Sequence, residues 1–285
     1  MILKDFLPNP VFKEFVQCYR IVHFEFENGA QIPVKAYTPK PEEVIHFFLV
    51  DFFAIEKCGL KEYQPSITLV GQRTFITMQH IGHNFLDFQI IFQPTALYRL
   101  TGIPSLELTN LCLDAEDIFT KSIRRIHEQL QHAESYNKML SIADKFVAEL
   151  IKQEKREVHL IDSVTRLMIR AGGNLSLDWL AKESCLCSKQ FKRKFRERVG
   201  VNPKTYGKII RFTKAFNTRN AYPLWNWLRI AVDCGYYDYQ HLVKDYKELT
   251  GLNPHEFHIL ENNAPERKLN LVDDLYQTRL KLYSL

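Results

Sequence analysis

Two segments in the last third of the chain repeat one pattern, and this repeat limits what that part can fold into. Residues 177–203 and 228–254 each read as a short helix, a tight turn, a second helix with apolar residues four apart, and Gly-x-Asn-Pro. The matching pairs are Ala181 and Ala231, Phe191 and Leu242, Phe195 and Tyr246, and Gly200 and Gly251. The repeat predicts a helical domain made of two similar units.

Each unit has the parts of a helix-turn-helix. The small alanine lets the first helix approach the second closely, and the second helix keeps one polar face free for a DNA major groove. Ser176 is a good N-cap for the first unit, and Gly172-Gly173 ends the helix before it. A longer helix from Pro203 to about Thr218 connects the units. Two reading helices held apart in this way are expected to enter successive major grooves, about one helical turn apart.

The polar face of each second helix supplies the predicted DNA contacts. In the first unit this face lies opposite Phe191 and Phe195, and Arg193 is the leading base contact because arginine suits guanine O6 and N7. In the second unit Asp238 is the expected N-cap. Gln240 suits adenine there. The full predicted set is Lys189, Lys192, Arg193, Arg196, Tyr239, Gln240, His241 and Lys244. Lys208, in the connecting helix, is a candidate phosphate contact.

Charge is distributed unevenly along the chain. Residues 1–154 carry 15 Lys and Arg against 19 Asp and Glu, a net charge of −4, whereas residues 155–262 carry 19 against 11, a net charge of +8. Residues 185–219 hold eleven basic residues and one acid, Glu197. A basic block confined to one domain is typical of contact with a phosphate backbone.

The first half of the chain reads differently. Strand-like runs rich in β-branched and aromatic residues occur at 19–26, 44–50, 66–70 and 85–92 and are separated by turn residues. Apolar residues then recur at three- and four-residue steps, which predicts amphipathic helices at 121–133 and 136–151. The expected fold is α+β and multidomain: an N-terminal β-rich sandwich or barrel followed by helices, and a C-terminal all-α domain with two helix-turn-helix motifs.

The expected boundaries follow from a charged linker at 152–157. Residues 1–154 form a β-rich sensory or dimerisation domain, residues 155–262 the DNA-binding domain, and residues 263–285 an amphipathic helical extension. That extension either packs on its own domain or pairs with another subunit. The aromatic run at 47–53 is longer than strand alternation requires, so it either lines a ligand cavity or forms a dimer edge.

The C-terminal third resembles the AraC/XylS family of transcription regulators over roughly 162–258. Family members read I-A-x-x-x-G-F-x-D-x-S-H-F-x-R-x-F…G-x-x-P in the second unit. This chain has Ile230-Ala231, Gly235-Tyr236, Asp238, His241, Leu242, Lys244, Tyr246, Gly251 and Pro254 at those places. Gln240 replaces the usual Ser and Lys244 the usual Arg. Cys187 stands where the first unit normally has a Ser N-cap. Arg211 and Ala215 fall where the family's linker helix carries Arg and Ala.

The N-terminal half resembles, less specifically, an uncharacterised domain found ahead of such modules. The matching residues are Val70-Gly71-Gln72-Arg73, Phe92-Gln-Pro94, Leu100-Thr-Gly102-Ile-Pro104 and Leu108-Thr109. The resemblance implies a sequence-specific regulator that binds a double-stranded DNA operator and is controlled by a small-molecule effector or by homodimerisation. RNA polymerase is a further candidate partner. The effector is not identified by the sequence.

Other classes of function fit the sequence less well. A catalytic thiol needs an activating electropositive pocket, whereas Cys18, Cys58 and Cys112 lie in apolar or strand-like sequence segments. His80 and His83 form one close histidine pair, which is more often structural than a metal site. We therefore expect no enzyme, no cofactor and no metal. The N-terminus lacks a secretory pattern and no apolar run approaches ~18 residues, so we expect a cytoplasmic protein without a membrane span.

Overall fold

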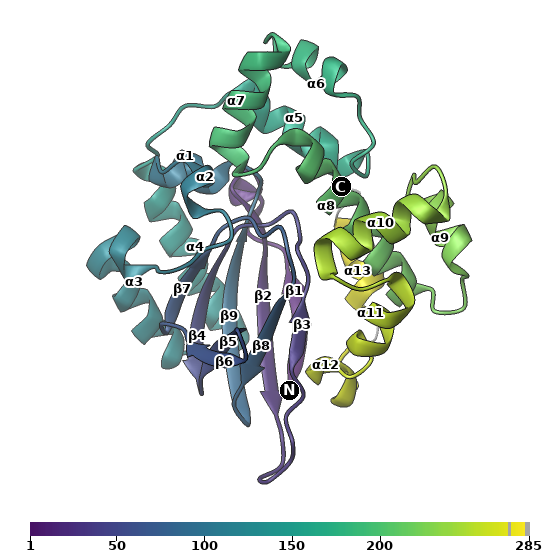
Figure 1. Ribbon diagram of the computed structural model, residues 1–285. Coiled ribbons are helices and arrows are strands. Elements are labelled where there is room, and N and C mark those ends of the chain that lie inside the picture. The colour runs from purple at the N-terminus through teal and green to yellow at the C-terminus, as the bar shows by residue number, and fades with distance from the viewer. Residues whose placement is uncertain (273–274, 283–285) are drawn as a thin grey trace.

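The computed structural model describes residues 1–272 and 275–282, without the side chains of 120, 121 and 282. It has an N-terminal part built on two β-sheets with helices on one side, and a C-terminal part that is all helical (Figure 1). The expected fold class is confirmed. The strands are β1 (Ile2–Phe6), β2 (Val16–Glu25), β3 (Lys35–Tyr37), β4 (Val44–Val50), β5 (Phe53–Lys57), β6 (Leu60–Tyr63), β7 (Ile67–Val70), β8 (Thr77–Ile81), β9 (Asn84–Phe92) and β10 (Cys112–Asp114).

The strands form two antiparallel sheets. The larger has the order β1-β2-β9-β4-β7-β10 and the smaller has the order β3-β8-β5-β6. Along β2, Tyr19 and Ile21 belong to the core that faces the helices, whereas Val22 and Phe24 belong to the core between the sheets. This alternation follows from the pleat, which points successive side chains to opposite faces.

The helices of the N-terminal part cover the outer face of the larger sheet. α3 (Glu116–Gln131) and α4 (Tyr136–Lys152) are amphipathic and bury Ile123, Phe146 and Val147 against it. Because this sheet is covered on both faces, Phe47 and Phe48 are both buried although they point to opposite sides. Phe53 lines a cavity that is described below. The aromatic run at 47–53 therefore contributes both to the packed cores and to the wall of a cavity. Shorter elements are η1 (Pro10–Phe12), α1 (Ala96–Thr101) and α2 (Ser105–Leu108).

The C-terminal part contains the two predicted units on either end of a long helix, α8 (Pro203–Ala221). Its remaining helices are α5 (Leu160–Arg170), α6 (Leu177–Glu183), α7 (Ser188–Val199), α9 (Trp227–Asp233), α10 (Tyr239–Thr250), α11 (Pro254–Glu261), α12 (Pro265–Lys268) and α13 (Leu275–Leu282). The first unit has its own core around Phe191 and Phe195, and the second has another around Leu242 and Tyr246. Figure 1 shows the first unit next to α1 and α2 and the second beside the strands β3 and β8.

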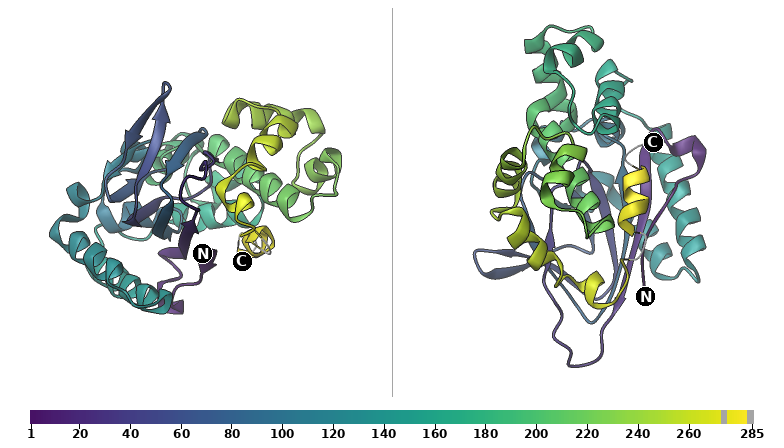
Figure 2. Two further views of the ribbon diagram at one scale, coloured as in Figure 1. Left: turned by 90° about the horizontal axis from the view of Figure 1, so that it is seen from below. Right: turned by 90° about the vertical axis from the view of Figure 1, so that its right-hand side faces the viewer.

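The C-terminal extension packs against its own chain over the residues that the structure describes. Tyr276 of α13 contacts Phe216 of α8, with ring centroids 5.7 Å apart, and Arg279 reaches Asp5 of β1 at 3.3 Å. The extension therefore returns to the N-terminal part, as Figure 2 shows from two further sides. Residues 273–274 and 283–285, and the side chain of Leu282, which formed part of the predicted amphipathic pattern, lie outside the described residues.

Candidate nucleic-acid interface

The first reading helix is α7, which is the second helix of the predicted unit at 177–203. Phe191 and Phe195 are buried on one face and form a tilted ring pair, with centroids 5.5 Å apart. The opposite face exposes Lys189, Lys192, Arg193 and Arg196. In the part of the chain that the structure describes, no carboxylate pairs with these four cations. The face is therefore polar, cationic and available.

The second reading helix is α10, which begins as predicted. Asp238 is the N-cap and accepts a hydrogen bond from the backbone N–H of His241 at 2.8 Å. That N–H group lowers the pKa of the Asp238 carboxyl. Gln240, His241 and Lys244 are exposed. Tyr239 is half-buried and packs at the edge of the second core, so it is less exposed than expected, and its contact with DNA stays a prediction.

The turns of the two units have the same backbone shape. Cys185 has φ +53° and Gly235 has φ +80°, and each lies four residues after the buried alanine of its unit, Ala181 or Ala231. Glycine adopts this left-handed region at little cost, whereas a residue with a Cβ is disfavoured there. Cys187 caps α7 without a side-chain hydrogen bond, as expected from its place in the family pattern.

The connecting helix α8 ties the two units together. Arg211 donates a hydrogen bond to the carbonyl of Gly173, just before the first unit, at 3.0 Å and pairs with Asp245 of α10 at 3.4 Å. Lys208 pairs with Glu248 of α10 and is half-buried. Lys208 therefore has a structural partner instead of the free position expected of a phosphate contact. The spacing of the reading helices depends on these cross-links.

The N-terminal part contacts the end of the first reading helix. The Ser105 hydroxyl donates to the carbonyl of Arg198 at 3.0 Å, and the Thr109 hydroxyl donates to the carbonyl of Gly200 at 2.9 Å. Gly200 has φ +88°, and a Cβ there would lie 2.6 Å from Thr109 Oγ1. Glycine is therefore needed both for the backbone shape and for the contact. We call this set of contacts the α2–α7 contact.

Arg198 anchors the same end of α7 from the other side. It forms two hydrogen bonds to the buried Asp162 of α5, at 2.8 and 2.7 Å, and its guanidinium lies 4.8 Å from the ring of Tyr98. Tyr98 in turn donates to Glu197 at 2.8 Å. A buried and fully paired arginine of this kind holds one geometry, because losing either partner leaves an uncompensated charge.

The N-terminal part also contacts the end of the second reading helix. The backbone N–H of Ile76 donates to the carbonyl of Leu249 at 3.0 Å. Lys35 of β3 pairs with Glu261 of α11 at 2.8 Å and with Glu266 of α12 at 2.5 Å. Both reading helices are thus held at their C-terminal ends by the first half of the chain, while their N-terminal turns are exposed.

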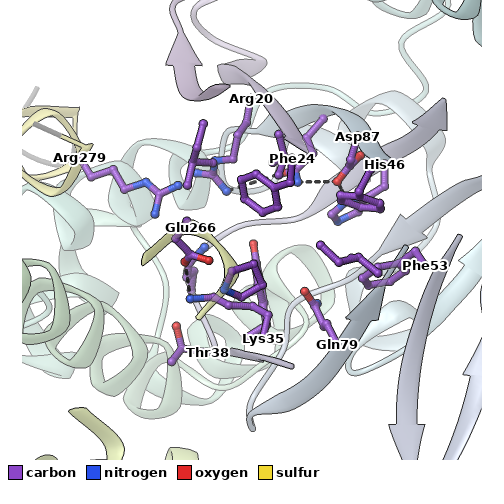
Figure 3. Close-up of a pocket in the computed structure, with 18 of the residues that line it drawn as sticks. Arg20, Phe24, Lys35, Thr38, His46, Phe53, Gln79, Asp87, Glu266 and Arg279 are labelled. Carbon is purple, nitrogen blue, oxygen red and sulfur yellow. Dashed lines mark hydrogen bonds and ion pairs between the residues drawn. The ribbon is translucent and has the colours of Figure 1, made fainter. Parts of the chain in front are cut away.

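A cavity of about 80 Å³ lies between the two parts (Figure 3). Phe24, Phe53 and Phe85 supply apolar walls from the β-sheets. The polar wall carries charged groups that are already paired: Arg20 with Asp5 at 2.6 Å, and His46 with Asp87 at 2.9 Å. Other polar residues of the N-terminal part that line the cavity are Lys35, Thr38, Lys40, Gln79 and Gln89. The C-terminal helices contribute Phe216, Glu266, Tyr276 and Arg279.

Among the cavity residues, Lys40 has a pKa well below its ordinary value. Burial lowers the pKa of Lys40 to about 7, although Glu42 acts in the opposite direction from 3.6 Å. This cavity is hard to predict from the sequence, because its walls come from β1, β2, β3, β4, β5, β8, β9, α8, α12 and α13, which lie far apart along the chain. The aromatic run at 47–53 was the only indication.

Comparisons with known proteins agree with this geometry. Residues 180–258 match a family described as a helix-turn-helix domain, which is of the AraC type. No curated protein matches the chain in sequence. Among the described residues no helix is long and apolar enough to cross a membrane, and no group of three His, Cys, Asp or Glu could hold a metal ion.

Solved structures of one bacterial protein are similar in fold. ToxT from Vibrio cholerae, solved at 1.65 Å resolution, aligns with 85% of this chain and 98% of its own, at 11% identity and a TM-score of 0.50. Wild-type ToxT with a bound unsaturated fatty acid aligns with 85% of this chain and 94% of its own, at 10% identity and a TM-score of 0.46. At this identity the likeness concerns the fold: an N-terminal part followed by a helix-turn-helix part.

Proposed function

We propose that this chain, whose residues 180–258 form a helix-turn-helix domain of the AraC type, is a transcription regulator that binds a specific site on duplex DNA through α7 and α10. The observation that carries the proposal is the shape of the two units. Each buries one face of its reading helix in its own core and exposes the opposite polar face. Helices of this kind dock in the major groove.

The two reading helices have different chemistry. α7 offers four exposed cations, of which Arg193 is suited to guanine and the others to guanine or phosphate. α10 offers Gln240, His241 and Lys244, where Gln240 is suited to adenine. Because α7 is the more basic, we expect it to supply more of the affinity and more of the salt dependence.

The N-terminal part is the proposed control element. It touches the C-terminal ends of both reading helices through the α2–α7 contact and through Ile76, and it shares the cavity with α8, α12 and α13. A small effector in this cavity would disturb the pairing of Lys35 with Glu266 and so shift the second unit relative to the first. A ligand changes an equilibrium only through such differential contacts.

Covalent catalysis by a thiol is disfavoured at three of the cysteines. Burial raises the pKa of the Cys18, Cys112 and Cys234 thiols, which disfavours the reactive thiolate. We further propose that the protein acts in the cytoplasm, where bacterial DNA lies. RNA polymerase and a second copy of this chain are candidate partners. Residues 1–154 would form the sensory segment, residues 155–262 the DNA-binding segment and residues 263–285 the C-terminal segment.

Substitution of Arg193 by Ala tests the proposal. If Arg193 reads a base, Arg193→Ala weakens binding to the selected site by ~1–3 kcal/mol and relaxes preference at one position, while binding to random duplex changes much less. Arg125→Ala, on the exposed face of α3, is the matched control and should change neither. Equal losses on both duplexes would remove Arg193 as a base reader.

A further inference from the structure

A second cleft, separate from the cavity between the sheets and the C-terminal helices, lies between the start of the chain and α5. It has a volume of about 580 Å³, and the residues that line it include Leu7, Lys13, Gln17, Arg166, Ile169 and Arg170. We call it the α5 cleft. None of these residues belongs to the predicted DNA-reading set or to the cavity of Figure 3.

The cationic side of the α5 cleft is formed by two arginines one helical turn apart. Arg166 and Arg170 are four residues apart and therefore lie on one face of α5. Arg166 makes one long hydrogen bond, 3.4 Å, to Ser163. Among the described residues neither arginine has a carboxylate partner, in contrast to Arg198 of α7, which pairs with Asp162 of α5. Two adjacent guanidinium groups match the geometry of a carboxylate, phosphate or sulfonate.

The opposite side of the cleft adds a positive charge, and its one carboxylate is already paired. Lys13 is exposed, and within the described chain no carboxylate pairs with it. Glu14, the only carboxylate among the lining residues, is already engaged by Arg99 at 2.7 Å. The cleft therefore presents an excess of positive charge to whatever enters it.

A strand irregularity directs a polar group to the floor of the cleft. Val16 pairs with Phe92 and Cys18 pairs with Ile91, so Gln17 is an extra residue without an opposite partner. Such bulges re-aim side chains and are common next to binding sites. The buried Oε1 of Gln17 has no hydrogen-bond partner. A carbonyl oxygen of this kind can only accept a hydrogen bond, so the acidic group of an occupant would lie at the arginines and not at Gln17.

The rest of the lining is apolar. Leu7, which is 67% exposed, forms an apolar shelf with Pro8 and Pro10, and Ile169 faces it from α5. We propose that the α5 cleft binds a small organic anion whose acidic group lies against the two arginines and whose apolar body lies on this shelf. The occupant would join the N-terminal part to the first helix-turn-helix unit, at a place distinct from the cavity.

Two fluorescent probes that share an apolar body test the proposal: 8-anilinonaphthalene-1-sulfonate, which is an anion, and N-phenyl-1-naphthylamine, which lacks the sulfonate. The full chain should bind the anion, and the double variant Arg166→Gln/Arg170→Gln should weaken that binding by about tenfold while leaving the neutral probe unchanged. Leu7→Gln should weaken both probes. Arg124→Gln/Arg125→Gln, on exposed α3, controls for net charge and should alter neither.

The competing locations give different results. If Val22→Phe, which narrows the cavity of Figure 3, abolishes binding of the anion and the α5 variant does not, the probe lies in that cavity and the proposal is wrong. If the α5 variant leaves the probe unaffected and weakens all DNA duplexes alike, the two arginines are DNA phosphate contacts and the proposal is wrong. An equal loss in the α3 control would also contradict it.

Discussion

The hydroxyl of Thr109 donates a hydrogen bond to the carbonyl oxygen of Gly200 at 2.9 Å, and this bond joins the N-terminal half to the last turn of the first reading helix. Gly200 is the left-handed residue that ends α7. Because the C-terminal end of a helix leaves carbonyl groups without partners inside the helix, a hydroxyl from a neighbouring element can satisfy one of them. The left-handed Gly200 ends the helix, and the bond from Thr109 fixes the position of that end.

Removing this hydroxyl should loosen the end of α7. Thr109→Val keeps the shape of the side chain and deletes the donor, so the free energy of unfolding should fall by about 1 kcal/mol. Hydrogen exchange of the last turn of α7 should become faster, while exchange in α10 stays the same. The exposed Thr278→Val provides the control. Unchanged exchange in α7 would show that this bond does not hold the helix.

The turn of the first unit should be improved by glycine. Cys185 has φ +53° although it carries a Cβ, and Gly235 occupies the equivalent place in the second unit. Cys185→Gly should raise the free energy of unfolding by about 0.5–1 kcal/mol, because it relieves the left-handed backbone. Cys185→Ala removes the thiol but keeps the Cβ, so it should bring no gain. Equal stabilities in urea for both variants would contradict this explanation.

Glu43 should make stability depend on pH. Burial raises the pKa of its carboxyl to about 8 from an ordinary 4.5, partly opposed by the nearby Ser105 hydroxyl. Between these values the folded chain binds more protons at this site than the unfolded chain, so its contribution is present below about pH 4.5 and is lost as the pH rises through about 8.

Glu43→Gln, which cannot ionise, should therefore become increasingly stable relative to the parent as the pH rises through that window. Urea unfolding at several pH values measures the difference. Glu107→Gln, on the exposed side of α2, is the control. A difference that stays constant with pH, or that shrinks as the pH rises, would be inconsistent with a buried, protonated Glu43.

The sequence predicted the local parts of this structure well. The helix at 188–199, the N-caps Ser176 and Asp238, and the exposed positions on α7 follow from periodicity and capping, which depend on residues close together in the chain. The strand runs near 44–50 and 85–92 were also found, since β-branched and aromatic residues mark them.

The contacts between the two halves could not be predicted in this way. Thr109 and Gly200 are 91 residues apart, and Lys35 and Glu261 are 226 apart. No periodic pattern reports such pairs, because each residue alone reads as an ordinary polar loop or helix position. Tyr239 and Lys208 are less exposed than their helical positions suggest, because Tyr239 packs on the second core and Lys208 pairs with Glu248.

Reading of DNA by two helices can be tested by selecting binding sites from a random duplex pool with the full-length chain and titrating the selected site with salt. We expect a recurring motif with two short elements about one helical turn apart and a steep fall of affinity with salt. Loss of the first element with Arg193→Ala and of the second with Gln240→Ala would assign α7 and α10 to them. A motif with a single element, or one unaffected by both substitutions, would contradict reading by two helices.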